Sequence, residues 1–277
     1  MPQTLKDRFL EDLKQDRFVL PSLPEVALAV RRVLDDQDAC ARDIAHTINQ
    51  DPAIAAKLLK VANSVFFRGR TACETVSAGV VRIGLRTTRE LVTGFAVKEL
   101  FKYDTPGLRE ATHAAWEHTM KIGAISHALA HHTGLFQAEE AMLAGMLSQI
   151  GVLSVFAYVA NYPEIYQDPE RMAETVAVLK NEVGALVLDR WAMPADYLSC
   201  ALESGDWFRD TGKSATLCDV VIVAERLALL GQKDLPRLDE MPAVNKLLGE
   251  ENGPETAIEF MAIARVQINE AQGLLAA

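Results

Sequence analysis

The stretch Glu139–Ala160, EEAMLAGMLSQIGVLSVFAYVA, decides the fold of this chain. Its last twenty residues carry no formal charge and are apolar on every face of a helix, and such a helix must be buried. The run is long enough to span a bilayer. However, two glutamates precede it, glycines and polar residues interrupt it, and no cluster of Lys or Arg flanks it. We therefore predict the core helix of a soluble helical bundle.

The composition is that of a soluble globular protein. The chain has 277 residues, enough for one large or two modest domains, with 49% hydrophobic and 24% charged residues. Its formal net charge is −10. A negative chain disfavours a nucleic acid or an anionic membrane as partner, because binding to either depends on Lys and Arg. We expect neither partner.

Neither the cysteines nor the first residues of the chain indicate a secreted protein. The four cysteines stand apart without a Cys-x-x-Cys pair, which argues against a zinc knuckle or a disulfide framework. Residues 1–18 mix charges of both signs and lack the apolar segment of a signal peptide. We therefore expect a cytoplasmic location.

Helix signals recur along the chain. Asp51 and Pro52 suit the N-cap and first position of a helix, and Gly84 suits a helix C-terminus. No alternating apolar and polar run indicates a strand in the first hundred residues. The turn-rich stretch 103–107 is the best internal break. We predict an all-α, multi-helix bundle of two packed lobes, residues 1–107 and 108–277, with a C-terminal helix at 254–275.

Three motifs occur in order along the first lobe. They are LPSLP at 20–24, DPAIAAKLLKVANS at 51–64 and IGL at 83–85. Their sequences and spacings resemble those of the HDOD family, bacterial signalling modules related to the HD phosphohydrolases. The resemblance covers residues 20–230, which together are similar to one HDOD domain. It implies an HD-like second lobe and a role in regulation.

The central stretch also resembles a motif of the HD phosphohydrolases, in which a His-Asp pair binds metal. The matching run is LAGMLSQIG at 143–151, where Ser148 and Gln149 stand at the His and Asp positions. His118, in the run WEHT, is similar to the first metal-binding His of these enzymes. The resemblance therefore implies that the paired ligands of the metal centre are replaced here.

The remaining positions of the HD site are also altered. Glu203 and Ser204 stand where the family commonly shows a His-His pair, and Glu225 stands near the place of the last metal carboxylate. The resemblance implies a vestigial pocket with no bound metal, no cofactor and no catalytic residue. Its members would be His118, Ser148, Gln149, Glu203 and Glu225.

Two further groups of residues are candidates for sites. His127 and His131 have the i, i+4 spacing of two ligands of one metal, and a pair of ordinary histidines is the alternative. Asn63, Arg82 and Arg86 form a candidate interaction or anion site at the junction of the lobes, because arginines near a cleft bind anions. Solvated surface arginines are the alternative.

These patterns favour one function and leave two others open. The favoured function is a non-enzymatic module of signal transduction that acts through protein–protein interaction, with other signalling proteins as partners. The alternative is a sensor whose vestigial pocket binds a nucleotide or metabolite. A metal-dependent phosphohydrolase is least favoured, since one His and one carboxylate do not make a catalytic metal site. The sequence predicts neither the identity of the partner nor the oligomeric state.

Overall fold

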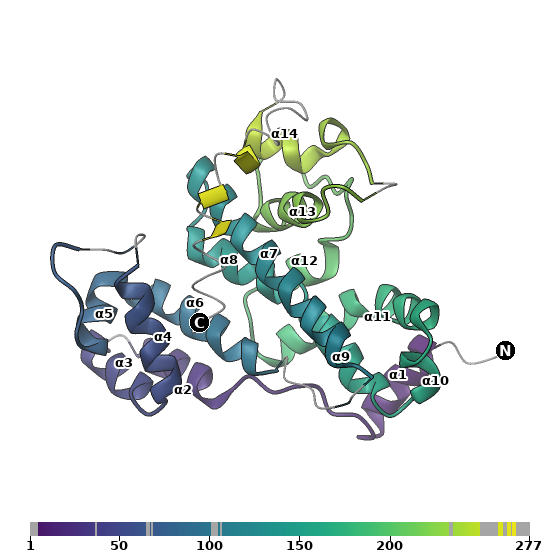
Figure 1. Ribbon diagram of the computed structural model, residues 1–277, viewed down its shortest axis with the longest axis horizontal. Coiled ribbons are helices and arrows are strands. Elements are labelled where there is room, and N and C mark those ends of the chain that lie inside the picture. Colours follow the sequence, from purple (N-terminus) through teal and green to yellow (C-terminus); the bar gives the residue numbers. More distant parts are fainter. Residues whose placement is uncertain are drawn as a thin grey trace. The chain divides into compact units, whose positions relative to one another are not determined.

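The computed structural model describes residues 5–36, 38–64, 67, 69–100, 105, 107–232, 235–249, 260–262, 265–266 and 268–269. Within these ranges the structure has 14 α-helices with defined bounds, one short 3-10 helix and no strand (Figure 1). The predicted all-α class is confirmed. The predicted break at 103–107 and the predicted helix at 254–275 lie largely outside the described residues.

The chain divides into two compact units. The large unit contains residues 5–22 and the described residues from Leu100 to Ile268, and the small unit contains the described residues from Leu23 to Glu99 together with Asn269. The predicted lobes, 1–107 and 108–277, grouped the first residues differently. In the structure these residues lie with the large unit, because α1 (Leu5–Lys14) packs against α11 (Pro169–Arg190).

The small unit is a bundle of short helices. They are α2 (Glu25–Leu34), α3 (Ala41–Ile48), α4 (Pro52–Ala62), α5 (Val76–Ile83) and α6 (Leu85–Leu100). Within the bundle, α3 packs against α2, α4 and α5, and α4 packs against α5. The carboxylate of Asp51 accepts hydrogen bonds from the first backbone amides of α4, as its sequence position predicts. Gly84, with φ 92°, separates α5 from α6.

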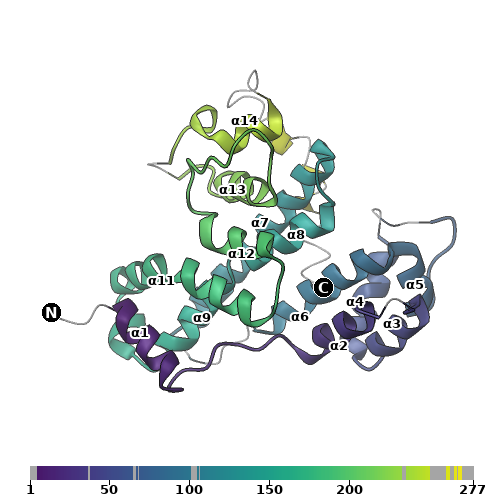
Figure 2. The same cartoon turned by 180° about the vertical axis from the view of Figure 1, so that it is seen from behind.

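The large unit is built around α7 (Arg109–Thr133). Its other elements are α1, α8 (Ala138–Leu147), α9 (Ile150–Val159), α10 (Pro163–Tyr166), α11, α12 (Ala195–Glu203), α13 (Leu217–Ala228), the 3-10 helix Leu238–Glu240 and α14 (Pro242–Leu248). Both α8 and α13 pack against α7, and α9 packs against α11, an arrangement visible from both sides of the unit (Figures 1 and 2).

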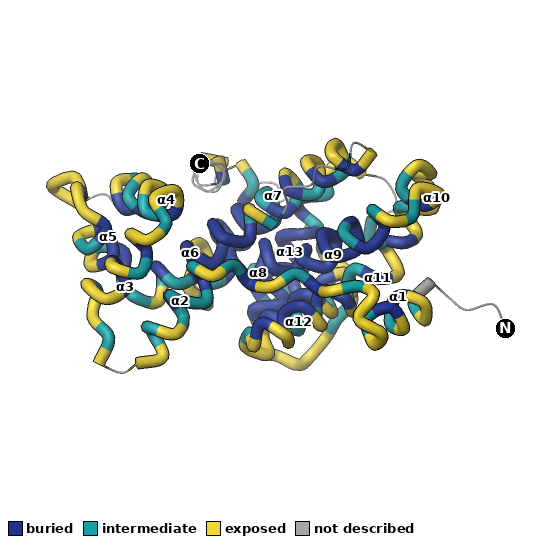
Figure 3. Tube along the Cα trace, turned by 90° about the horizontal axis from the view of Figure 1, so that it is seen from below, coloured by how far each residue is buried: buried dark blue, intermediate teal, exposed yellow. Residues whose placement is uncertain are grey.

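The central stretch is buried, but it is not one continuous helix. Residues 141–156 are all buried, and α9 and α13 are dark blue along most of their length in Figure 3. Ala138–Val159 is the one stretch of the described residues that is apolar and long enough to cross a membrane, and 89% of its most apolar 18-residue window is buried inside the protein. Ser148 and Gln149 separate α8 from α9, and the Ser148 hydroxyl donates to the carbonyl of Gly145 over 2.8 Å.

Glycines allow these helices to approach closely. A Cβ atom on Gly145 of α8 would lie 3.1 Å from the Cα of Gly123 on α7. A Cβ atom on Gly151 of α9 would lie 2.8 Å from the backbone nitrogen of Gly184 on α11. Side chains at these positions would separate the helices. The glycines therefore fix the spacing of α7, α8, α9 and α11, the first and last of which carry residues of the candidate site.

Candidate functional site

His118 and Glu225 face the same part of the large unit from two helices. His118 lies on α7 and is partly buried, while Glu225 lies on α13 and is only 4% exposed. Burial lowers the pKa of His118, and the nearby charge of Glu225 opposes that shift without cancelling it. The imidazole is therefore held in its neutral form at neutral pH.

Lys180 of α11 brings a positive charge to this site. Its Nζ atom donates to the Oε1 atom of Glu225 over 3.4 Å, and its charge helps to lower the pKa of His118. Lys121, one turn after His118 on α7, also lies close enough to lower that pKa, and its Nζ atom donates to the carbonyl of Ala228 over 2.6 Å. The sequence did not predict either lysine, because nothing local distinguishes them from solvated lysines.

Ser148 and Gln149 form hydrogen bonds with each other and with the end of α8. Both are 4% exposed, in the turn between α8 and α9. The Gln149 side-chain amide donates to the Ser148 hydroxyl over 3.2 Å, and that hydroxyl donates to the Gly145 carbonyl. These bonds satisfy polar groups that would otherwise be costly to bury. The pair thus has a structural role in the break between the two helices.

Glu203 belongs to a different network from the one predicted. Its carboxylate pairs with the guanidinium of Arg209, which also donates to the Thr216 hydroxyl over 3.1 Å and lies 3.5 Å from a carboxylate oxygen of Asp219. Asp219 is fully buried, and Lys246 lies 3.7 Å from the same oxygen. The contacts of Glu203 place it with this group, at the C-terminus of α12, and not with His118 and Glu225.

The residues predicted to form a vestigial pocket do not fit the metal centre that the HD resemblance implies. His118 can supply one neutral nitrogen, but Glu225 is paired with an ammonium group, and a hydroxyl and an amide are poor ligands for a divalent ion. The described ranges contain no group of three or more His, Cys, Asp or Glu side chains that could hold a metal.

The two histidines with i, i+4 spacing lie in different environments. His127 is buried, with its Nε2 atom 3.9 Å from the Oε1 atom of Glu139, whereas His131 is exposed. Burial would raise the pKa of Glu139, but the proximity of His127 and His131 holds it below its usual value. His127 therefore connects α7 to the start of α8, as an ordinary core histidine would.

The amino-acid sequence from residue 20 to residue 206 matches the family model of the HDOD domain. The chain belongs to the HDOD family. This match begins where the resemblance of the LPSLP motif begins, and it extends through most of the large unit to the turn after α12.

Solved structures share the fold of this HDOD chain. An HDOD domain protein of unknown function from Geobacter sulfurreducens is 19% identical, with a TM-score of 0.69 over 98% of this chain and 99% of that one. A Shewanella amazonensis protein, provisionally named a metal-dependent phosphohydrolase, is 23% identical, with a TM-score of 0.83 over 97% and 96%. A Marinobacter aquaeolei protein, provisionally named a signal transduction protein, has a TM-score of 0.62, 19% identity, and coverage of 100% and 62%.

A curated relative is also longer than this chain. An uncharacterised protein of Treponema pallidum is 26% identical over 192 residues, which are 63% of this chain and 35% of the relative. The HDOD chain thus spans about a third of the length of the curated relative it matches.

In the HDOD chain, Asn63 and Arg82 meet in the small unit and hold a loop. The Asn63 side chain donates to the carbonyls of Leu59 and Cys73 and accepts from the Cys73 amide over 2.7 Å. Arg82 donates to the carbonyls of Ala62 and Thr71 over 3.1 and 2.6 Å. These bonds close the segment from α4 to α5, which gives both residues a structural role. Arg86 is exposed in the first turn of α6.

Proposed function

We propose that this HDOD chain is a non-enzymatic module of signal transduction that acts by binding other proteins. One observation carries the first half of the proposal: the ammonium group of Lys180 lies on Glu225, the carboxylate nearest the place of the last HD ligand. A fixed positive charge there repels a divalent ion and occupies the carboxylate that would bind it.

The chemistry of the HD enzymes depends on that ion. A bound divalent metal lowers the pKa of a water molecule, so that hydroxide forms near neutral pH and attacks a phosphoester. Ser148 and Gln149 carry no charge at neutral pH, and the structure bonds them to each other and to Gly145. Without a metal, none of these side chains acidifies a water molecule.

We expect protein purified without chelator to contain no stoichiometric iron, manganese or zinc. We also expect it to leave a generic phosphodiester unhydrolysed when manganese is added. Elemental analysis and a colorimetric hydrolysis assay measure both quantities. Stoichiometric metal that disappears in His118→Ala would contradict the proposal.

Variants that rebuild the site provide the control. Ser148→His with Gln149→Asp restores two ligands but leaves Lys180 in place, so we expect weak metal binding. Adding Lys180→Ala should then tighten the Kd for manganese by about tenfold or more, since an ammonium group near the site opposes a divalent cation. Calorimetric titration measures the difference. Equal affinity with and without Lys180 would show that this lysine does not exclude the metal.

Exposed apolar side chains support the second half of the proposal. They lie on α11, on α12 and in the turn after it: Val178, Leu186, Leu202 and Phe208. Phe208 is 57% exposed, in a turn held by an Arg209–Glu203 ion pair and by a bond from the Phe208 amide to Asp206. An exposed aromatic ring on a fixed backbone loses little entropy on binding, which suits it to anchor a protein partner.

We expect Phe208→Ser to weaken the capture of protein partners without changing the melting temperature. A tagged chain incubated with lysate of its native host, followed by identification of the captured proteins, measures the effect. Leu135→Ser is the matched control, because Leu135 is similarly exposed, at 54%, but lies in the turn after α7. If the same partners are captured equally by all three proteins, the binding surface lies elsewhere.

A ligand sensor is the second candidate, and it rests on Glu225. The Oε2 atom of this buried carboxylate has no hydrogen-bond partner among the described residues. A donor group of a nucleotide or metabolite would satisfy it. Stabilisation of the native chain, but not of Glu225→Gln, by a nucleotide or metabolite would favour the sensor.

A further inference from the structure

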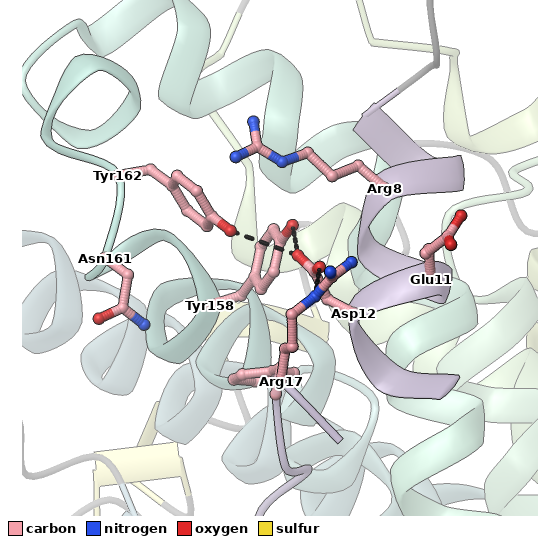
Figure 4. A pocket seen from close by; sticks show the side chains of 8 residues that line it. Arg8, Glu11, Asp12, Arg17, Tyr158, Asn161 and Tyr162 are labelled. Carbon is pink, nitrogen blue, oxygen red and sulfur yellow. Dashed lines mark hydrogen bonds and ion pairs between the residues drawn. The ribbon is translucent and has the colours of Figure 1, made fainter. Parts of the chain in front are cut away.

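A polar cavity lies in the large unit, formed by α1, the end of α9 and the residues that follow each of them. Its volume is about 460 Å³, within the range of roughly 300–1,000 Å³ that is typical of small-molecule sites. The lining residues are Arg8, Glu11, Asp12, Arg17, Phe18, Tyr158, Asn161 and Tyr162 (Figure 4). None of them belongs to the vestigial HD pocket, and no motif in the sequence drew attention to them.

Asp12 is the main hydrogen-bond acceptor among the residues of this cavity. The carboxylate is 5% exposed, and it accepts hydrogen bonds from the Tyr158 hydroxyl over 2.6 Å, the Tyr162 hydroxyl over 3.3 Å and the Nε atom of Arg17 over 2.7 Å. The bond from Tyr158, with the others, lowers the pKa of Asp12 despite its burial. Burial and the adjacent carboxylate raise the pKa of Tyr158, which stays a donor. Asp12 is therefore an ionised anchor with both oxygens already used.

The guanidinium of Arg8, at the edge of the cavity, has N–H groups that are available to bind a ligand. Its guanidinium lies 4.5 Å from the centre of the Tyr162 ring, and in Figure 4 it reaches from α1 across the cavity toward that ring. Among the described residues, the Tyr162 ring is the one group that the Arg8 side chain is seen to contact in this way. The stacking fixes the plane of the guanidinium and leaves its N–H groups pointing outward from the edge of the plane.

Two more donors lie around the same space. Arg17 uses its Nε atom on Asp12, so its two terminal nitrogens are left for another acceptor. Asn161 lines the cavity opposite α1 and carries an exposed side-chain amide (Figure 4). The remaining charged residue, Glu11, accepts a hydrogen bond from the side chain of Gln15 over 2.6 Å. The formal charges of the lining residues sum to zero, so any preference for one class of ligand comes from the positions of these hydrogen-bond donors.

We propose that this cavity binds a small organic oxyanion, whose carboxylate or phosphate group is held by Arg8 and Arg17 and whose remaining part lies against Tyr162. A planar guanidinium presents paired N–H groups that match the two oxygens of such a group. A cationic ligand would meet two arginines, while the one buried carboxylate is already satisfied. This site is separate from the vestigial pocket, and its existence does not depend on the proposed function.

The test uses inorganic phosphate and benzoate as probes of the full chain, with sodium chloride at matched ionic strength. We expect phosphate, benzoate or both to raise the melting temperature, by roughly 4 °C or more at about 100 times the Kd. Phosphate alone would identify a phosphorylated ligand, and benzoate alone an aromatic carboxylate. If neither probe shifts the melting temperature more than the chloride control does, the proposal is wrong.

Variants show whether the shift arises in this cavity. Arg8→Gln should weaken the Kd of the effective probe by about tenfold or more, because it removes a charged and bidentate donor. Arg8→Lys keeps the positive charge but lacks the planar guanidinium, so its Kd should lie between those of the native chain and Arg8→Gln. Arg190→Gln, an exposed arginine at the end of α11, is the matched control and should bind as the native chain does. Calorimetric affinities that are unchanged in Arg8→Gln would place the anion elsewhere and overturn the proposal.

Discussion

Replacing Leu147 by Asp is expected to prevent the chain from folding into a soluble protein. Leu147 is the last residue of α8 and is fully buried. Since α8 packs against α7, α12 and α13, the new carboxylate would have no path to solvent. An unpaired charge buried in this way costs several kcal/mol, which is comparable with the whole stability of a typical domain, about 5–15 kcal/mol.

The soluble fraction after expression and the far-ultraviolet circular dichroism of the product measure this effect. Leu147→Met is the control for the position, because a swap of similar volume in a core costs less than about 1.5 kcal/mol. Leu135→Asp is the control for the charge, since Leu135 is 54% exposed. A soluble Leu147→Asp variant that melts at the native temperature would contradict the central position of α8.

The burial of α8 and α9 could be predicted because it depends on local composition. A run without charge has no polar face to turn toward water, and that is true in any tertiary arrangement. The N-cap of α4 at Asp51 and the C-terminus of α5 at Gly84 were predictable for the same reason, since a cap is a contact within a few residues. The break at Ser148 and Gln149 was missed because two polar residues between apolar ones still fit a helical pattern.

Contacts between distant parts of the chain could not be predicted in this way. The packing of α1 on α11, and the bond from the Trp191 indole to the Pro21 carbonyl over 2.9 Å, join segments more than a hundred residues apart. Asp12 and Tyr158 meet only because of this packing, so the cavity that they form has no signature in the sequence. A bulky or charged residue in α1 is indistinguishable from any other surface residue until its partner is known.

The candidate site was predicted in part, because the family resemblance supplied positions but not partners. It singled out His118 and Glu225, and in the structure the charge of Glu225 lies close enough to His118 to oppose the effect of burial on its pKa. It also singled out Glu203, and the expectation of an anion site near a cleft singled out Arg82. Their contacts with Arg209 and with backbone carbonyls give both residues structural roles. Lys180 was missed because its contact with Glu225 joins residues 45 positions apart, and such an ion pair leaves no local pattern in the sequence.

Gly151→Ala is expected to lower the melting temperature by roughly 6–12 °C, because it forces α9 and α11 apart. The new methyl group would overlap the carbonyl oxygen of Lys180 and lie 2.8 Å from the backbone nitrogen of Gly184, and neither backbone atom can rotate away. Overpacking of this kind costs about 3 kcal/mol at the upper end of its usual range, which corresponds to that change in melting temperature.

A graded series separates crowding from the general effect of adding a methyl group. At Gly184 the methyl group would lie 3.3 Å from its nearest neighbour, and at Gly205 it would lie 3.7 Å from the side chain of Asn181. We therefore expect a smaller loss for Gly184→Ala and none for Gly205→Ala. Melting curves of the three variants, recorded by circular dichroism, test this order, and equal melting temperatures would show that α9 and α11 are not in close contact.

The same substitution also tests how the helix spacing controls the electrostatic environment of His118. The carbonyl group that Gly151→Ala displaces belongs to Lys180, whose ammonium group lies on Glu225. Moving α11 away should lengthen this ion pair and reduce the positive charge near His118, so the imidazole pKa should rise relative to the native chain. Proton NMR titration of His118, in folded Gly151→Ala and in Gly205→Ala, measures that shift. If the melting temperature falls while the His118 pKa stays unchanged, then α11 deforms where it faces residue 151 without moving the side chain of Lys180.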